Sequence, residues 1–265
     1  MLNELSIDNL ELKGKKALVR VDFNVPITNG KIGDDWRIQA SIPTIEKILD
    51  DGGIAILMSH LGRPKGKKDK SLSLEPVAQR LSELLGKKVK FVDDCIGDKV
   101  KKVIENAQPG NCILLENLRF HKEEKANDTT FAKELASLAD VYIDDAFATA
   151  HRAHASTVGV VEYFDQVAAG YLLLKELDKL GYLLRSPEHP FIAVIGGLKI
   201  STKIKLLRNL LPKVDKIIIG GAMSYTFFKA LGLEVGVSPY EQEFVEEAKS
   251  ILQDVDTDTK LLLPV

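Results

Sequence analysis

Short apolar runs alternate with longer amphipathic stretches along the first half of the chain. The longer stretches repeat their apolar positions with the spacing of helices, and they cover residues 41–52, 74–86, a segment near 98–107, and 128–138. The short runs are apolar throughout, which is typical of strands buried on both faces of a parallel sheet. These predicted strands cover residues 16–21, 54–58, 89–92, 112–116 and 141–143. Pro43 is expected in the first turn of its helix and Ser73 at the N-cap of the next.

The alternation breaks after residue 143 and resumes after residue 190. A long helical stretch, 168–186, ends before Pro187 and Pro190. Strands are then predicted at 191–195, 216–221 and 260–264, with helices at 201–211, from Met223 and from Pro239. The pattern predicts an α/β fold of two doubly wound, Rossmann-like parallel-sheet domains joined by a helix. We expect domains at 1–168 and 190–265, a linker at 169–189, and a second domain left incomplete where the chain stops at Val265.

Composition narrows the class of protein without identifying it. The chain has 265 residues and a formal net charge of −2, so no global field attracts nucleic acid or an anionic membrane. The N-terminus lacks the pattern of a signal peptide, and no apolar run is long enough to span a bilayer. Cys95 and Cys112 lack metal-ligand spacing. We therefore expect a cytoplasmic monomer with no metal ligands of its own among these residues, and with no nucleic-acid or membrane partner.

Polar and basic side chains follow four of the five predicted strands in the first half. In open α/β sheets, ligands bind at the carboxyl edge, where these side chains should meet. Arginine forks match phosphate and carboxylate geometry, so the pattern predicts a site for a small anion. A single arginine in such a place is typical of an ordinary surface, and lysines 65–70 are typical of a solvated loop. The hypothesis therefore depends on recurrence among Asp22, Asn24, Arg37, His60, Arg63, Arg119 and Arg152.

The second half offers two glycine pairs, each between a predicted strand and a helix. The first is followed by two lysines, and glycines let a backbone approach a ligand while helix N-termini favour phosphate. Neither stretch is a Walker A loop or a GxGxxG turn. By themselves, two such glycine pairs are more often tight strand–helix connections than phosphate sites, so that alternative stays open. The residues concerned are Gly196, Gly197, Lys199, Lys203, Gly220 and Gly221.

Taken together, these stretches resemble the phosphoglycerate kinase family. The matching motifs, in order, are RVDFNVP (20–26), DDWRI (34–38), SHLGRP (59–64), LLENLRF (114–120), DAFATAHRAHAST (145–157), GGLKISTKI (196–204) and IIGGAMSYTF (218–227). Seven motifs in order and spacing, along nearly the whole chain, leave little room for coincidence. The resemblance implies reversible phosphoryl transfer between 1,3-bisphosphoglycerate and ADP, giving 3-phosphoglycerate and ATP.

The resemblance also implies roles for individual residues. It implies that Arg37, Lys199 and Lys203 are catalytic, that Mg²⁺ accompanies the nucleotide, and that its protein ligand lies beyond Val265. The implied nucleotide-binding residues are Gly196, Gly197, Lys199, Lys203, Gly220 and Gly221. The implied phosphoglycerate-binding residues are Asp22, Asn24, Arg37, His60, Arg63, Arg119 and Arg152.

The chain departs from the family pattern at four positions: Ala148, Leu198, Thr202 and Ala222. Together with the expected truncation, these departures leave an alternative open, a catalytically incomplete fragment or pseudoenzyme that acts as an anion-binding module. A nucleic-acid-binding protein is disfavoured by the net charge and by the lack of aromatic residues among the basic ones.

Overall fold

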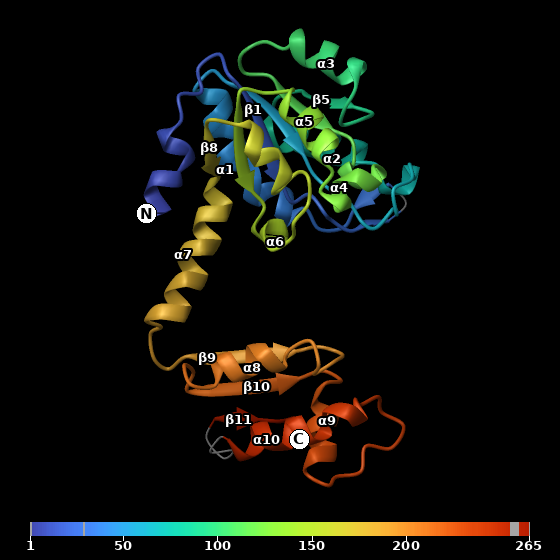
Figure 1. The fold of residues 1–265 in the computed structure, drawn as a ribbon, viewed down its shortest axis with the longest axis vertical. Helices are drawn as coiled ribbons and strands as arrows, with labels where there is room; N and C mark the ends of the chain where they lie inside the picture. Colours follow the sequence, from blue (N-terminus) through green and yellow to red (C-terminus); the bar gives the residue numbers. More distant parts are fainter. Residues whose placement is uncertain (1, 29, 255–259, 265) are drawn as a thin grey trace. The chain divides into compact units, whose positions relative to one another are not determined.

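The structure is a computed structural model that describes residues 2–28, 30–254 and 260–264, and the chain divides into two compact units, Met1–Asp178 and Lys179–Val265 (Figure 1). The first unit is built on a six-stranded parallel sheet in the order β5-β6-β4-β1-β7-β8. Five strands lie where the sequence predicts them: β1 (Lys16–Val21), β4 (Ile54–Met58), β5 (Val89–Val92), β6 (Cys112–Leu115) and β7 (Val141–Asp145).

The sixth strand, β8 (Val167–Ala169), was not predicted, and it pairs in parallel with β7. It occupies the region where the sequence pattern placed the start of the long helix. Three residues are too few to show a period, and Gly170 separates them from the helix α7 (Tyr171–Arg185). The predicted helix start at 168 is therefore wrong by three residues.

Helices cover both faces of the first sheet, as the apolar strands require. Along β1, Ala17, Val19 and Val21 join a core cluster with α1 (Trp36–Asp50) and α2 (Glu75–Leu85). Leu18 faces the other way, into a cluster with α3 (Asp98–Glu105) and α5 (Thr129–Ala136). The doubly wound prediction is confirmed for this unit, and the carboxyl edge of the sheet is left for loops.

Two further predictions about helix starts in the first unit, for Pro43 and Ser73, differ from the structure. Helix α1 begins at Trp36, whose amide donates to Asp34 Oδ1 at 2.9 Å, so Pro43 lies inside the helix and not in its first turn. Leu74, not Ser73, is the N-cap of α2; Ser73 Oγ accepts from the Glu75 amide, and the carboxylate of Glu116 accepts from the Leu74 amide. Both starts use polar contacts that hydrophobic spacing does not record.

Several short elements were also absent from the prediction because they are too short for a period. They are the hairpin β2 (Ile27–Thr28) and β3 (Lys31–Ile32), the helices α4 (Lys122–Ala126) and α6 (Phe147–Ala150), and the 3₁₀ turns Leu2–Leu5, Ile7–Asn9, Lys70–Leu72, Leu118–Phe120 and Gly159–Tyr163. The helix predicted from Pro239 starts later than predicted, because the 3₁₀ turn Gln242–Phe244 precedes an α-helix that begins at Val245. No helix in the described part of the chain combines the length and apolar composition needed to cross a membrane.

The second unit contains the three predicted strands as a parallel sheet in the order β11-β10-β9. The strands are β9 (Ile192–Gly196), β10 (Lys216–Gly220) and β11 (Leu261–Leu262). Helices α8 (Ile204–Leu210), α9 (Ser224–Ala230) and α10 (Val245–Gln253) share one core cluster with Ile217 and Ile219. On the other face, Val194, Ile218 and Leu262 lie side by side and exposed. In the described residues, the helices of this unit therefore cover one face of the sheet.

The start of helix α7 is attached to the first sheet by a buried cap. The first unit ends within this helix, at Asp178. The Oδ1 atom of Asp145 accepts the backbone amides of Leu172 at 2.9 Å and Leu173 at 3.2 Å, and Thr44 Oγ1 accepts that of Tyr171. A side chain at Gly170 would place its Cβ 2.3 Å from this same oxygen. Burial raises the pKa of Asp145 to about 7. The cap therefore titrates in the neutral range.

This cap predicts a pH dependence of stability. Because the folded-state pKa lies above the unfolded value, Asp145 contributes stability at low pH, and that contribution is lost as pH rises through about 7. Asp145→Asn keeps an acceptor for the two amides and removes the titration. Urea unfolding followed by circular dichroism at pH 5.5 and 8.0 should show a smaller pH effect in this variant than in the parent. Asp140→Asn, at the other end of β7, is the control, and equal pH effects in all three proteins would contradict the assignment.

Candidate functional site

A cleft of about 660 Å³ lies at the carboxyl edge of the first sheet and is strongly basic. Its walls come from the loop after β4, the segment from β6 to α4, and the loop after α6. None of the described residues that line it is acidic, and all but one carry a basic side chain: Arg63, Lys65, Gly66, Arg119, His121, Lys122, Lys125, Arg152 and His154. Such a surface suits an anion with more than one charged group.

Arg119 is the most deeply buried arginine of the cleft, at 7% exposure. One terminal nitrogen donates to the carbonyl of Gly62 at 2.8 Å, while its Nε is buried with no hydrogen-bond partner in the described residues. Burial and the charges of Arg152 and Arg20 hold the pKa of Arg119 below its usual value. A buried donor without an acceptor is unfavourable, so the site is arranged for an acceptor that a ligand would bring.

The loops that carry the cleft are fastened to each other by amide side chains. Asn117, fully buried after β6, accepts from the amides of Leu61 and Arg119 and donates to the carbonyls of Leu61 and Leu72. Asn24, a predicted ligand, accepts from the Gly62 amide at 2.9 Å. In this structure Asn24 therefore joins the loops after β1 and β4 and is not one of the residues lining the cleft.

His60 lies behind the cleft, 4% exposed, and is held by a buried arginine of the central strand. Arg20 donates to His60 Nδ1 at 3.1 Å and to the carbonyl of Val21. Because a guanidinium only donates, Nδ1 must be the acceptor, which leaves the imidazole neutral with its proton on Nε2. Burial, followed by the charges of Arg20, Arg119 and Arg152, lowers the pKa of His60 to about 2. The ring is thus a fixed neutral donor.

The charge of Arg20 is compensated through a serine. Arg20 Nε donates to Ser156 Oγ at 3.0 Å, and that hydroxyl donates to Glu124 Oε1 at 2.6 Å. The Ser156 amide donates to Glu124 Oε2 at 3.0 Å, and the Ala155 amide to the Glu124 carbonyl at 2.9 Å. Arg20 and Glu124 are both fully buried. This link also fixes the segment that carries Arg152 and His154.

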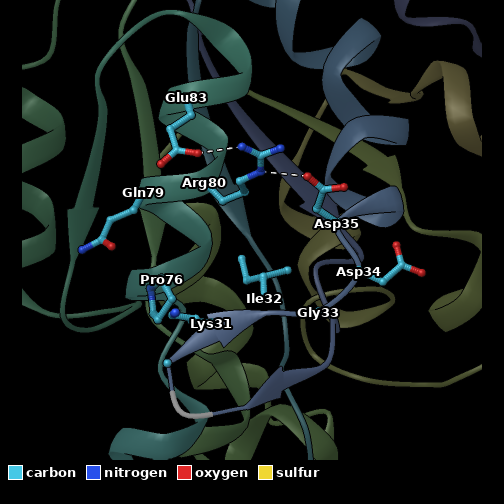
Figure 2. A pocket seen from close by; sticks show the side chains of 10 residues that line it. Lys31, Ile32, Gly33, Asp34, Asp35, Pro76, Gln79, Arg80 and Glu83 are labelled. Atoms are coloured by element: carbon cyan, nitrogen blue, oxygen red, sulfur yellow. Dashed lines mark hydrogen bonds and ion pairs between the residues drawn. The ribbon is translucent and has the colours of Figure 1, made fainter.

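Arg37 lies beside Asp22 and is not one of the residues lining the cleft. Its guanidinium forms an ion pair with the Asp22 carboxylate, and about half of the Arg37 side chain is exposed (49%). Arg80 on α2 is paired with two carboxylates (Figure 2). It reaches Asp35, at the start of α1, at 2.8 Å, and Glu83, on its own helix, at 2.6 Å. The surrounding hollow, about 740 Å³, is larger than the basic cleft, but its arginine is already paired with carboxylates. It therefore offers no comparable anion site.

Part of the lysine loop is held against the protein and is not simply solvated. The ammonium of Lys68 is 2.9 Å from Asp94 Oδ2, and His121 Nε2 is 2.7 Å from Asp94 Oδ1. The Gly66 amide donates to the Arg119 carbonyl at 3.2 Å. Lys65 and Lys67 are both exposed, but only Lys65 lines the cleft.

In the second unit, the two glycine turns pack backbone against backbone. Gly196 pairs with Gly220 at the ends of β9 and β10, and the Met223 amide donates to the Gly197 carbonyl at 2.9 Å. Gly221 has a φ of +71°, and a Cβ there would lie 2.9 Å from the Gly197 carbonyl oxygen. Lys199 is exposed and Lys203 is the N-cap residue of α8. Close packing thus explains Gly221 without a ligand.

Residues 7–265 match the family model described as phosphoglycerate kinase. The chain belongs to the phosphoglycerate kinase family. A phosphoglycerate kinase of Chloroherpeton thalassium is 54% identical over 99% of this chain, and one of Dictyoglomus turgidum is 56% identical over 94%. This chain covers 66% and 62% of those two proteins, so it spans less than two thirds of their length.

Solved structures agree with this membership. The structure of phosphoglycerate kinase from Coxiella burnetii is 44% identical with a TM-score of 0.81, and it matches 98% of this chain and 66% of its own. The enzyme from Pyrococcus horikoshii OT3 is 29% identical with a TM-score of 0.88, over 98% of this chain and 67% of its own. The family fold is therefore present over nearly all of this chain.

The four departures from the family pattern can be placed in the structure. Ala148 lies in the helix α6 and is not among the residues with positive φ, so a methyl group there meets no backbone strain. Leu198 is 65% exposed beside the first glycine pair. Thr202 donates to the carbonyl of Lys199 at 3.0 Å, and Ala222 follows Gly221, whose φ is positive.

Sequence reasoning missed the residues that support the cleft from behind. Arg20 stands in an otherwise apolar strand, which was the available signal for a buried charge in need of partners. Glu124 sits among the exposed charges of KEEK and gave no signal of its own. Lys122 and Lys125 line the cleft because α4 turns them toward it, and that short helix was not predicted.

The serine between Arg20 and Glu124 gives a prediction about stability. Ser156→Ala removes the hydroxyl that pairs with both charges, so Arg20 Nε and Glu124 Oε1 each lose a buried hydrogen bond. The free energy of unfolding should fall by about 1–3 kcal/mol. Urea unfolding measures this, with the exposed Ser137→Ala as control. Equal losses in the two variants would show that the link contributes no stability.

Proposed function

We propose that this chain takes part in reversible phosphoryl transfer between 1,3-bisphosphoglycerate and ADP, giving 3-phosphoglycerate and ATP, with the phosphoglycerate bound in the basic cleft. One observation carries the proposal: a cleft without acidic lining residues, in which the buried Nε of Arg119 has no acceptor. A phosphate or carboxylate oxygen would provide that acceptor. The identity to phosphoglycerate kinases over nearly the whole chain supports the same reaction.

In this proposal residues 1–168 hold the phosphoglycerate, residues 169–189 link the two parts, and residues 190–265 contribute to the nucleotide side. Arg63, Arg119 and Arg152 bind the phosphoglycerate's anionic groups directly. His60 offers its Nε2 proton, Asn24 and Asp22 shape the loop after β1, and Asp22 orients Arg37. Arg37 then stabilises charge on the phosphoryl group as it moves.

On the nucleotide side, we propose that Lys199 and Lys203 face the phosphates, while the glycine pairs Gly196–Gly197 and Gly220–Gly221 let the nucleotide approach the backbone. The nucleotide would arrive with Mg²⁺ as part of the substrate. In the ATP-consuming direction the nucleophile is a carboxylate, already ionised at pH 7, so no general base is needed. Catalysis then consists of positioning and charge stabilisation. We propose that the protein acts in the cytoplasm as a monomer and has no nucleic-acid or membrane partner.

The proposal predicts a loss of binding when Arg119 is truncated. Arg119→Ala removes charge-assisted hydrogen bonds worth roughly 1.5–3 kcal/mol. The affinity for 3-phosphoglycerate should fall by about ten- to a hundredfold, measured by titration calorimetry. Arg119→Lys should recover part of the affinity, because it restores the charge without the fork. Arg80→Ala, at the paired arginine in the other hollow, is the control and should bind as the parent does. Unchanged binding by Arg119→Ala would remove this residue from the site.

The assignment of the two units predicts different effects for two lysines. Lys203→Ala should weaken binding of Mg-ADP and leave 3-phosphoglycerate binding unchanged. Lys67→Ala should change little beyond the salt dependence of association, because Lys67 is exposed and its charge is screened. Both ligands can be titrated into both variants by calorimetry. A larger loss of nucleotide binding in Lys67→Ala than in Lys203→Ala would overturn the assignment.

A further inference from the structure

His154 lies in the wall of the basic cleft with its ring nearly buried. Its side chain is 11% exposed, and Nδ1 is 3.7 Å from Oε1 of the fully buried Glu124. Within the described residues neither ring nitrogen has a hydrogen-bond partner. The backbone that follows His154 is held in place, because Ala155 and Ser156 are bonded to Glu124.

Opposing charges surround this ring. Burial lowers the pKa of His154 from its usual value, Glu124 acts against that shift, and Arg119, Arg152 and Arg20 reinforce it. Without a ligand, burial and then the cationic neighbours outweigh Glu124, so the pKa of His154 is lowered and the ring is less readily protonated than a free histidine. The titratable and charged groups that face it across the cleft and from behind are Arg20, His60, Arg63, Lys65, Arg119, Lys122, Glu124, Lys125 and Arg152.

Of the other histidines near the cleft, His151 is exposed, accepts from Arg152 Nε at 3.3 Å and does not line the cleft, while His60 and His121 are already committed. The Nδ1 atom of His60 accepts from Arg20, and the pKa of His60 is lowered to about 2, so this ring stays neutral. His121 pairs through Nε2 with the carboxylate of Asp94 at 2.7 Å. His154 is therefore the cleft histidine whose charge a bound anion can change.

We propose that His154, placed against the buried carboxylate of Glu124, takes up a proton from solvent when a phosphate-bearing acid enters the cleft, so that ligand binding is coupled to pH. This inference rests on the proposed function, because it takes 3-phosphoglycerate as the ligand. The only bond formed is the N–H bond between the solvent proton and a ring nitrogen of His154. Glu124 acts here as a positioning residue, since it touches His154 and not the ligand.

The physical reason is charge balance around a nearly buried ring. Adding an anion cancels the repulsion that the arginines exert on a protonated His154, and Glu124 then stabilises the imidazolium from the opposite side. The ligand therefore raises the pKa of His154, and by reciprocity a proton raises the affinity for the ligand. Affinity gained through His154 is complete below the pKa of the free state. It is lost as pH rises through the pKa of the complex.

The ligand's own phosphate also titrates, near pH 6, and this trend runs the opposite way. A comparison with His154→Gln separates the two effects, because the variant retains the ligand's titration alone. His189→Gln, at an exposed histidine of the second unit that pairs with Asp215, is the matched control.

The test is calorimetric titration of 3-phosphoglycerate into the 265-residue chain, in two buffers of different ionisation enthalpy, between pH 5.5 and 8. The parent and His189→Gln should take up more protons on binding than His154→Gln. The affinity ratio of parent to His154→Gln should increase about fivefold or more from pH 8 to pH 6. Equal uptake in all three proteins would overturn the inference. No binding by the parent would overturn the proposed function instead.

The role of Glu124 has its own readout. In nuclear magnetic resonance titrations of the ligand-free protein, the His154 ring proton should titrate at lower pH in Glu124→Gln than in the parent. An unchanged titration would contradict the role assigned to Glu124. If Glu124→Gln does not fold, the calorimetric comparison with His154→Gln decides the proposal by itself.

Discussion

The guanidinium of Arg20 is fully buried in the central strand of the six-stranded sheet, and the candidate site is arranged around it. An uncompensated charge at that depth would be strongly unfavourable. Three groups compensate it: the Val21 carbonyl, His60 Nδ1 and Ser156 Oγ. Each belongs to a different stretch of chain, so satisfying one charge brings the loop after β4 and the segment after α6 to the same edge. Glu124 completes the balance through the serine.

The same arrangement gives the cleft its electrostatic character. The side chains behind its wall are held by buried hydrogen bonds to one another, whereas Arg119 in the wall has a donor to spare. A ligand anion would therefore meet donors held in place by buried contacts, and little reorganisation would be needed on binding. The lysines at the mouth are more exposed, and their attraction is screened by salt. Arg119 and Arg152 should accordingly matter more for affinity than the lysines do.

Much of the fold could be predicted from the order of apolar runs. The strands β1, β4, β5 and β7 have the predicted residues or begin at them, because a strand buried on both faces is apolar along its whole length. The pattern failed where contacts other than apolar packing set the ends of an element. Helix α1 begins at Trp36, five residues before the predicted start, where the Asp34 side chain accepts the Trp36 amide. Strand β8 is too short to show a period. For the site, strand-exit reasoning found the arginines of the cleft. It could not find Glu124 or separate Arg37 from the cleft, because both depend on which partner a side chain meets in three dimensions.

The buried, unpartnered Nε of Arg119 should donate a hydrogen bond to a phosphoglycerate oxygen. The most direct measurement follows the arginine Nε–H resonances of the chain by nuclear magnetic resonance as 3-phosphoglycerate is added. We predict a large shift of the Arg119 Nε–H resonance and slower exchange of its hydrogen. The Arg20 resonance should change little, because its Nε already has a partner, and that of Arg80 should not change. A saturating titration that leaves the Arg119 resonance in place, while other arginines shift, would contradict it.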